Sequence, residues 1–202
     1  MQSKSDITRE KILKAAEEVF AEKGLHGARV DEIAAVAGVN KRMIYVHFES
    51  KENLYAEVLS RIYKGVAEME KGFDMTLPPD EAIRNIIKVY FRHHVENPRF
   101  VSLVMWENLN KATYIDKSGA ALIKDESVGG LKALIKRGID EGMFRDDISE
   151  NEIVFAINMF SFSYFSNKYT MPRVLKINPA DEAMLDKRSN MVADMILKYL
   201  KK

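Results

Sequence analysis

Cysteine is absent from this 202-residue sequence, and only five residues are proline. The absence of cysteine excludes disulfide bonds, thiolate nucleophiles and cysteine-based zinc sites, and it fits a reducing environment. The few prolines and glycines fall at plausible joints between segments. We therefore expect a cytoplasmic protein that is not held together by covalent cross-links.

Long apolar runs are also missing. The most apolar stretch, Val154 to Phe165, is interrupted by Asn158, Ser161 and Ser163. A membrane-spanning helix needs roughly 18 or more nearly uninterrupted apolar residues. The first residues, 1–6, are polar and lack the apolar segment of a secretory signal. We expect no membrane partner and no secretion.

Neither sign of charge dominates. The formal net charge is only +1, although charged residues make up 30% of the chain and apolar residues 47%. Such a composition can bury a large core and is not that of a disordered chain. A nucleic-acid-binding protein with so little net charge must concentrate its positive charge locally.

Alternating strand patterns are absent, and apolar residues recur at spacings of three and four, which predicts an all-α protein of about nine helices. The first helix is expected over about 8–23, closed by Gly24. Ser50 can cap a long helix over about 51–72. Other helices are predicted over about 80–95 with Asp80 as N-cap, over 99–110 and 118–137, from a capping box at Ser149, and from an N-cap at Asn178 to the end.

The segment from Val30 to Phe48 has the spacing of a helix-turn-helix. Gly38 permits the positive backbone angle that a tight turn requires. The small side chain of Ala34 lets the two helices approach, and Val39 and Ile44 fill the space between them. In such motifs the N-terminal part of the second helix enters the major groove of duplex DNA.

The second helix of this motif is expected over about 41–47, with Asn40 as its N-cap. Three basic residues face one acid from Gly38 to Lys51, whereas the charges balance over residues 1–55. The alternative is a plain helical hairpin with a polar outer face, which is common in all-α proteins. The exposed surface is predicted to carry Lys41, Arg42, Met43, Tyr45 and His47.

A wider set of residues lies at several fixed spacings around this motif. They run from Thr8-Arg-Glu-Lys-Ile-Leu-Lys-Ala-Ala through Phe20-Ala-Glu-Lys-Gly24 to Ile33-Ala34, Ala37-Gly38-Val39, Tyr45, His47-Phe48 and Ser50-Lys51-Glu52. Over about residues 8 to 60, this set resembles the N-terminal domain of TetR-family regulators. Beyond it, the chain resembles the family in helix count, in the Gly142-x-Phe144 turn and in two interface-like final helices.

The resemblance implies a DNA-binding domain over residues 1–50 and a role for each matched position. Arg29 stands where the family usually has a capping Ser or Thr; it cannot cap in that way, but its guanidinium suits a phosphate. Arg42 stands where a small residue is common, and it suits either a guanine or a phosphate. Phosphate contacts are implied for Tyr45, His47 and Lys51, and base contacts for Asn40, Lys41, Arg42 and Met43.

The resemblance also implies that residues 51–202 form a helical effector-binding and dimerisation domain. The stretch from Ile153 to Phe165 is apolar on nearly every face, which indicates that one face is buried against a second chain. The last helix is amphipathic. Together these two C-terminal helices predict a homodimer joined by an intermolecular four-helix bundle. In the alternative, both helices are ordinary core of a monomer.

A small-molecule effector would need a mostly apolar pocket with a few polar groups. Polar groups for such a pocket could also come from Glu107, His93 and His94. The two histidines are not expected to hold a metal ion, because adjacent residues point about 100° apart on a helix. We expect neither a metal nor a cofactor. Core packing is the alternative role for each candidate. The predicted lining residues are Phe100, Met105, Trp106, Asn108, Tyr114, Asn158, Phe162 and Phe165.

Three functions are consistent with these patterns. The first is a ligand-responsive transcriptional regulator, most simply a repressor, that binds a palindromic operator as a homodimer and is released by a small-molecule effector. The second is an interaction protein that uses double-stranded DNA as a platform and has no effector. The third is an enzyme, which no Ser/His/Asp spacing, metal motif or phosphate loop supports.

Overall fold

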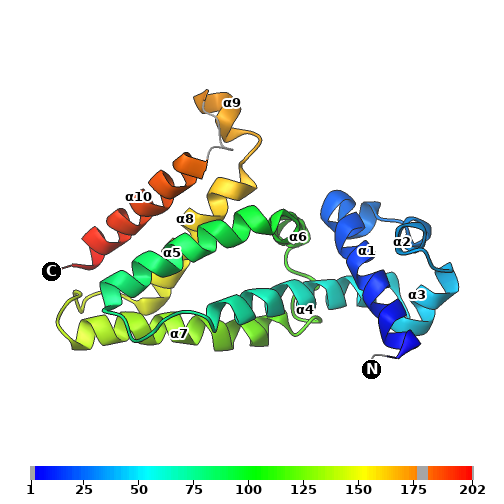
Figure 1. Cartoon of the computed structure of the whole chain (residues 1–202), viewed down its shortest axis with the longest axis horizontal. Helices are drawn as coiled ribbons and strands as arrows, with labels where there is room; N and C mark the ends of the chain where they lie inside the picture. The colour runs from blue at the N-terminus through cyan, green and yellow to red at the C-terminus, as the bar shows by residue number, and fades with distance from the viewer. Residues whose placement is uncertain (1–2, 177–181, 202) are drawn as a thin grey trace. The chain divides into compact units, whose positions relative to one another are not determined.

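The computed structural model describes residues 3–176 and 182–201, except for the side chains of 120–127, 182 and 183. These residues form ten α-helices, so the all-α prediction is confirmed (Figure 1). None of the described helices is long and apolar enough to cross a membrane. The helices are α1 (Lys4–Gly27), α2 (Val30–Ala37), α3 (Lys41–Phe48), α4 (Lys51–Glu70), α5 (Pro79–Glu96), α6 (Pro98–Leu109), α7 (Ala120–Asp140), α8 (Glu150–Ser166), α9 (Met171–Leu175) and α10 (Glu182–Leu200).

The start of α1 is set by a capping box that the sequence analysis did not predict. The backbone N–H of Asp6 donates to Ser3 Oγ at 3.1 Å, and the Asp6 carboxylate accepts from the Ser3 backbone at 3.1 Å. The Ser3 hydroxyl also donates to the Asp6 carboxylate at 2.8 Å, and this bond, together with the one from the Ser3 backbone, holds the pKa of Asp6 below its usual value. The predicted left-handed cap at Gly24 was wrong: Gly24 has φ +66° and ψ 176° and lies at a kink inside α1, which continues to Gly27 and has Ala28 as its C-cap.

Of two other predicted caps, one was wrong and the other was right in its position but lacks the capping hydrogen bond. Pro78, not Asp80, is the N-cap of α5, and Pro79 occupies the first helical position, which suits a residue without a backbone N–H. Asp80 lies in the first turn, where its charge is favourable to the helix dipole. Ser149 is the N-cap of α8, but its side chain makes no capping hydrogen bond. The predicted cap at Asn178 lies outside the described residues.

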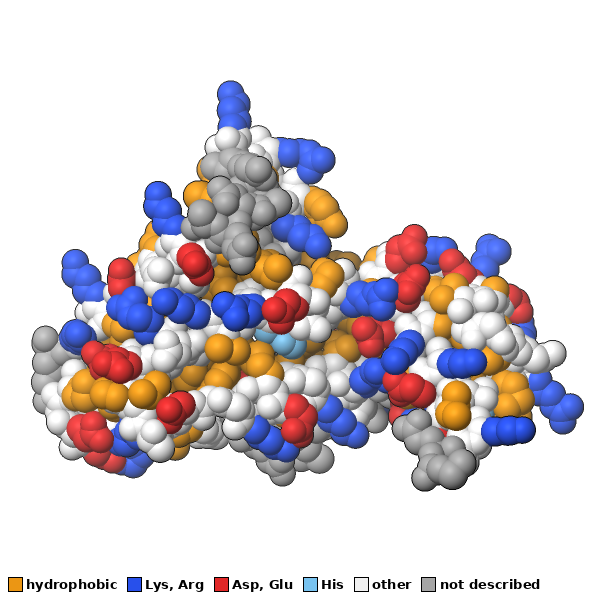
Figure 2. All heavy atoms as spheres, in the orientation of Figure 1, with side chains coloured by type: hydrophobic (Ala, Val, Ile, Leu, Met, Phe, Trp, Pro, Cys, Tyr) orange, Lys and Arg blue, Asp and Glu red, His pale blue; other side chains and the backbone are white. Residues whose placement is uncertain are grey.

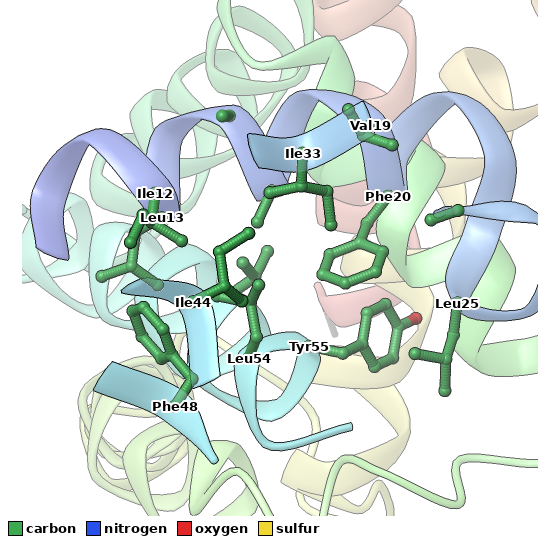
Figure 3. Packing of buried hydrophobic residues seen from close by; sticks show 14 of the residues in the cluster. Ile12, Leu13, Val19, Phe20, Leu25, Ile33, Ile44, Phe48, Leu54 and Tyr55 are labelled. Carbon is green, nitrogen blue, oxygen red and sulfur yellow. The ribbon is translucent and has the colours of Figure 1, made fainter. Parts of the chain in front are cut away.

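The chain divides into two compact units. The first contains residues 3–67 and 99–124, which include α1 to α3 and most of α4 and α6. Helices α2 and α3 pack on α1. The ring of Phe20 meets the ring of Tyr55 edge-on, with 5.0 Å between centroids (Figure 3). The core of this unit includes Ile12, Leu13, Val19, Phe20, Leu25, Ile33, Ile44, Phe48, Leu54, Tyr55 and Leu103.

The second unit contains residues 68–98 and 125–201 of the described chain, including α5, α8, α9, α10 and most of α7. Helix α5 packs against both α8 and α10. The Arg137 guanidinium donates to the backbone carbonyls of Met75 and Leu77, which ties the segment before α5 to α7. The predicted division of function at residue 50 stays a prediction. Buried residues of this unit include Ile83, Ile87, Ile135, Phe144, Ile157 and Leu200.

Candidate nucleic-acid interface

The turn between α2 and α3 has the geometry that the helix-turn-helix spacing predicts. Gly38 adopts the left-handed conformation, with φ +65° and ψ 36°. The backbone N–H of Val39 donates to the carbonyl of Ala34 at 3.0 Å, which closes the end of α2. Ile33 and Ile44 are fully buried between the helices. The turn therefore fixes the direction in which α3 leaves α2.

Helix α3 presents a narrow outer face. Asn40 is its N-cap, as predicted, and Asn40 Oδ1 accepts from the backbone N–H of Arg42 at 2.8 Å. Ile44 and Phe48, four residues apart, point into the core. Arg42 and Tyr45 lie on the exposed side. The cap uses one of the two lone pairs of Asn40 Oδ1 and holds the side chain at the start of α3, with both amide N–H donors left for a base edge.

At two apolar residues of α3 the exposed surface differs from the one predicted. Met43, predicted to be exposed, is half-buried and packs against the core of the first unit. Val46, which the sequence analysis did not select, is 64% exposed. Its distance of four residues from Arg42 was the available signal, because residues i and i+4 share a helix face. An exposed aliphatic group at this place suits contact with the methyl group of thymine.

The basic residues around α3 differ in whether they are already paired. Lys41 Nζ forms an ion pair with Asp31 at 2.9 Å, and the hydrogen bond to Asp31 raises the pKa of Lys41. Lys23 pairs with Glu32. Among the described residues, the guanidinium of Arg42 has no ion pair or hydrogen bond. Figure 2 shows acidic and basic side chains interspersed on the visible face. Which basic side chains can bind a DNA phosphate or base without leaving an acidic partner therefore depends more on pairing than on the number of charges.

The implied phosphate contacts have different surroundings. Tyr45 is 44% exposed, whereas His47 is half-buried and its Nε2 has no hydrogen-bond partner among the described residues. Lys51 Nζ donates to the backbone carbonyl of Ala28 at 3.2 Å. Lys51 thus reaches the residue next to Arg29, which is the exposed N-cap of α2 and makes no side-chain capping bond, as predicted. Two cations therefore lie at the start of α2.

Five of the predicted effector residues lie in the first unit. Trp106 Nε1 donates to the carbonyl of Ala21 at 3.2 Å. The rings of Phe100 and Tyr114 contact the rings of Tyr63 and Tyr55, respectively, with centroids 5.9 and 5.5 Å apart. These three aromatic residues make packing contacts within the unit. Met105 and Asn108 are exposed.

The other three predicted effector residues lie in the second unit. The rings of Phe162 and Phe165 lie 5.8 and 5.4 Å from the ring of His94. Asn158 Nδ2 donates to the carbonyl of Val154 at 2.8 Å, a bond within α8. The eight predicted effector residues thus fall into two groups, five in the first unit and three in the second. A single pocket lined by all eight stays a prediction.

A buried acidic group lies in the first unit. Glu107 is only 3% exposed, and its Oε2 accepts from the backbone N–H of Tyr114 at 3.1 Å. Burial, with a smaller contribution from the nearby Glu107 charge, raises the pKa of Tyr63 to about 12. Burial also raises the pKa of Tyr55. The Glu107 charge therefore adds to the effect of burial on the pKa of both tyrosines.

Comparison with known proteins gives matches over most of the chain. Residues 12–58 match the family model described as bacterial regulatory proteins of the tetR family, and residues 79–196 match the tetracyclin repressor-like C-terminal domain. The HTH-type transcriptional repressor NicS of Pseudomonas putida is 33% identical over 200 residues, which cover 98% of this chain and 94% of NicS. RutR, an HTH-type transcriptional regulator of Escherichia coli, is 36% identical over 124 residues, 61% of this chain and 55% of RutR.

Solved structures share the fold. The regulator PfmR of Thermus thermophilus superposes with a TM-score of 0.72 at 22% identity, covering 95% of this chain and 99% of PfmR. A mutant of HlyIIR superposes with a TM-score of 0.67 at 28% identity, covering 98% of this chain and 97% of that one.

Proposed function

This chain belongs to the TetR family of transcriptional regulators, and we propose from that premise that it is a repressor. In this proposal it binds a palindromic operator as a homodimer and leaves the operator when a small-molecule effector binds. The name of NicS, which describes a transcriptional repressor, supports repression.

The observation that carries the DNA-binding part is the outer face of α3. The Gly38 turn and the Asn40 cap hold this helix in place, and its exposed side presents Arg42 without a competing partner. A guanidinium in this position can pair with guanine in the major groove. The proposed base contacts are Asn40, Lys41, Arg42, Met43 and Val46, and the proposed phosphate contacts are Arg29, Tyr45, His47 and Lys51.

A homodimer is supported by two exposed apolar stripes in the second unit. On α8, Phe155 and Met159 are 61% and 43% exposed. On α10, Met191, Met195 and Tyr199 recur every four residues and are each about half exposed. Contiguous exposed apolar surface of this kind is typical of protein interfaces. A twofold pairing of α8 and α10 with their copies would bury both stripes.

Effector release follows from the dimer. Two recognition helices must lie about 34 Å apart to enter successive major grooves on one face of the duplex. A ligand that binds better to a dimer with another spacing lowers the DNA affinity by shifting the population. The effector therefore needs no contact with the DNA-binding residues.

The test is a gel shift with the full-length protein and the DNA upstream of its own gene. We expect a discrete complex that scrambled DNA of equal length does not compete away. The experiment is repeated at low salt, where phosphate contacts are strongest. Absence of a complex at low salt would contradict the proposal, and equal binding to scrambled DNA would contradict operator recognition.

A further inference from the structure

A groove of about 430 Å³ lies in the second unit, among α5, α8, α9 and α10. Its size is in the range of about 300 to 1,000 Å³ that small-molecule sites occupy. The groove shares no residue with the effector pocket that was predicted from the sequence. Its walls are mostly apolar and aromatic, with Phe91, Phe160 and Met191 among them.

One cation faces this apolar groove. The guanidinium carbon of Arg188 lies 4.1 Å from the centroid of the Tyr164 ring, a cation–π contact that fixes its position. Arg188 Nη1 is shielded from solvent and has no hydrogen-bond partner among the described residues. A buried donor without a partner is unfavourable. Nε and Nη2 of Arg188 are not among the shielded atoms and make no hydrogen bond or ion pair with the described residues, so their N–H groups can donate to an acceptor that enters the groove.

The residues around Arg188 determine which charge and shape of ligand the groove can accept. Among the described residues, the lining of the groove includes no Asp or Glu that could pair with Arg188, and no second Lys or Arg that a phosphate dianion would favour. A single guanidinium matches one carboxylate, through one or two N–H···O bonds. The rings of Phe91 and Tyr164 are nearly parallel, 28° apart, with centroids separated by 6.2 Å. Flat apolar walls suit an aromatic or aliphatic body.

We propose that this groove binds a small hydrophobic carboxylate, with the carboxylate on Arg188 and the apolar body against Phe91, Phe160 and Met191. Phe160 and Met191 are also 42% and 54% exposed on α8 and α10, the helices of the proposed dimer face. A ligand in the groove would therefore touch that face and change how two chains pair. The effector role rests on the proposed function, whereas binding itself does not.

Binding is measured by calorimetry on the full-length protein without DNA. The probes are 2-naphthoate and decanoate, each compared with its neutral amide. We expect both acids to bind more tightly than their amides. Arg188→Met should weaken acid binding by at least about tenfold, since a hydrogen bond to a charged group is lost, and should leave amide binding unchanged. Arg188→Lys should restore part of the acid affinity.

Arg84→Met is the matched control. Arg84 also has a half-buried guanidinium in the second unit, but it pairs with Asp194 at 2.7 Å, outside the groove. This variant should bind both acids like the wild type. Circular dichroism melts establish that each variant is folded.

Three results would overturn the proposal. The first is that neither acid binds the wild-type protein, as when a partner chain fills the groove. The second is that Arg188→Met and Arg84→Met lose the same affinity for the acids. The third is that Arg188→Met loses the same affinity for each acid and for its amide. A gel shift of the ligand-free protein tests operator binding separately. A chain that binds its operator but neither acid would therefore refute the groove alone.

Discussion

Single residues around α3 differ in what DNA must displace to reach them. Lys41 is held by Asp31, and Lys51 by the carbonyl of Ala28. Arg42 has no such partner in the described part of the chain. A phosphate or base that binds Lys41 must therefore replace an existing ion pair, whereas Arg42 can bind without that loss. The contribution of each cation to affinity depends on this difference as well as on its position.

Arg42→Ala should weaken binding to the preferred operator by about 1–3 kcal/mol and relax the preference at one base pair, because a bidentate guanine contact is lost. Binding titrations against operators changed at each position measure this. Arg92→Ala, an exposed arginine of α5, is the control. An equal loss on every sequence would instead assign Arg42 to a phosphate.

Asp31→Asn should increase affinity for the operator, because Lys41, a proposed base contact, then reaches the DNA without breaking its ion pair. Binding titrations at one fixed salt concentration measure this. Glu22→Gln removes a negative charge from the same unit without touching Lys41, and should have a smaller effect. If both variants raise the affinity equally, the overall negative charge of the unit, and not the ion pair with Asp31, lowers the contribution of Lys41 to DNA binding.

Tyr63 should make the protein sensitive to alkali. Its pKa is about 12 in the folded chain, against about 10 when unfolded. Between these values the unfolded state loses the proton first, so stability falls as pH rises above about 10. The contribution lost by pH 10.5 is about 0.8 kcal/mol. Thermal melts at pH 8.0 and 10.5 should show a smaller drop for Tyr63→Phe, and equal drops would exclude this cause.

Among the elements, Gly24 inside α1 and Gly38 at the end of α2 have nearly the same positive φ, +66° and +65°, but differ in ψ and in their surroundings. A Cβ on Gly24 would lie 2.7 Å from the ring of Trp106, which is closer than any ordinary contact. A Cβ on Gly38 would meet nothing within 4 Å. The first glycine is required by packing and conformation, and the second by conformation alone.

Gly38→Ala should therefore cost about 1 kcal/mol of unfolding free energy, the penalty for a left-handed residue with a side chain. Gly24→Ala should cost about 2–5 kcal/mol, since overpacking against Trp106 adds to the same penalty. Urea unfolding of both variants measures the difference. Equal costs would show that the Trp106 ring moves aside freely.

The helices of this fold were largely predictable, because apolar spacing and caps such as Asn40 act locally. The short α9 was not, since five residues carry too little periodicity to be recognised. The sequence did not predict that Val46, and not Met43, lies on the exposed face of α3. This depends on how α3 is rotated where it packs on α1, which is a tertiary effect. Arg188 had no sequence signal, because its importance comes from the aromatic walls around it and not from its neighbours in the chain.

At the scale of the whole molecule, the exposed stripes on α8 and α10 predict the state in solution. Met195→Glu places a charge in the middle of the α10 stripe, and we expect it to convert the dimer to a monomer, because an unpaired charge would be buried at the interface. Sedimentation equilibrium measures this. Arg92→Glu, a charge reversal at an exposed position of α5 away from both stripes, should leave the dimer intact. A wild-type monomer would refute the homodimer.

Trp106 is the single tryptophan of the chain, and its indole lies on Gly24 and donates to the carbonyl of Ala21, both in α1. The tryptophan fluorescence of the unmodified protein, excited selectively over its eight tyrosines, therefore comes from one place, against α1 of the DNA-binding unit. Any ligand or operator that shifts α6 along α1 should change the emission wavelength or intensity. The protein thus carries its own optical probe, and its transitions can be followed in stopped-flow experiments without an attached dye.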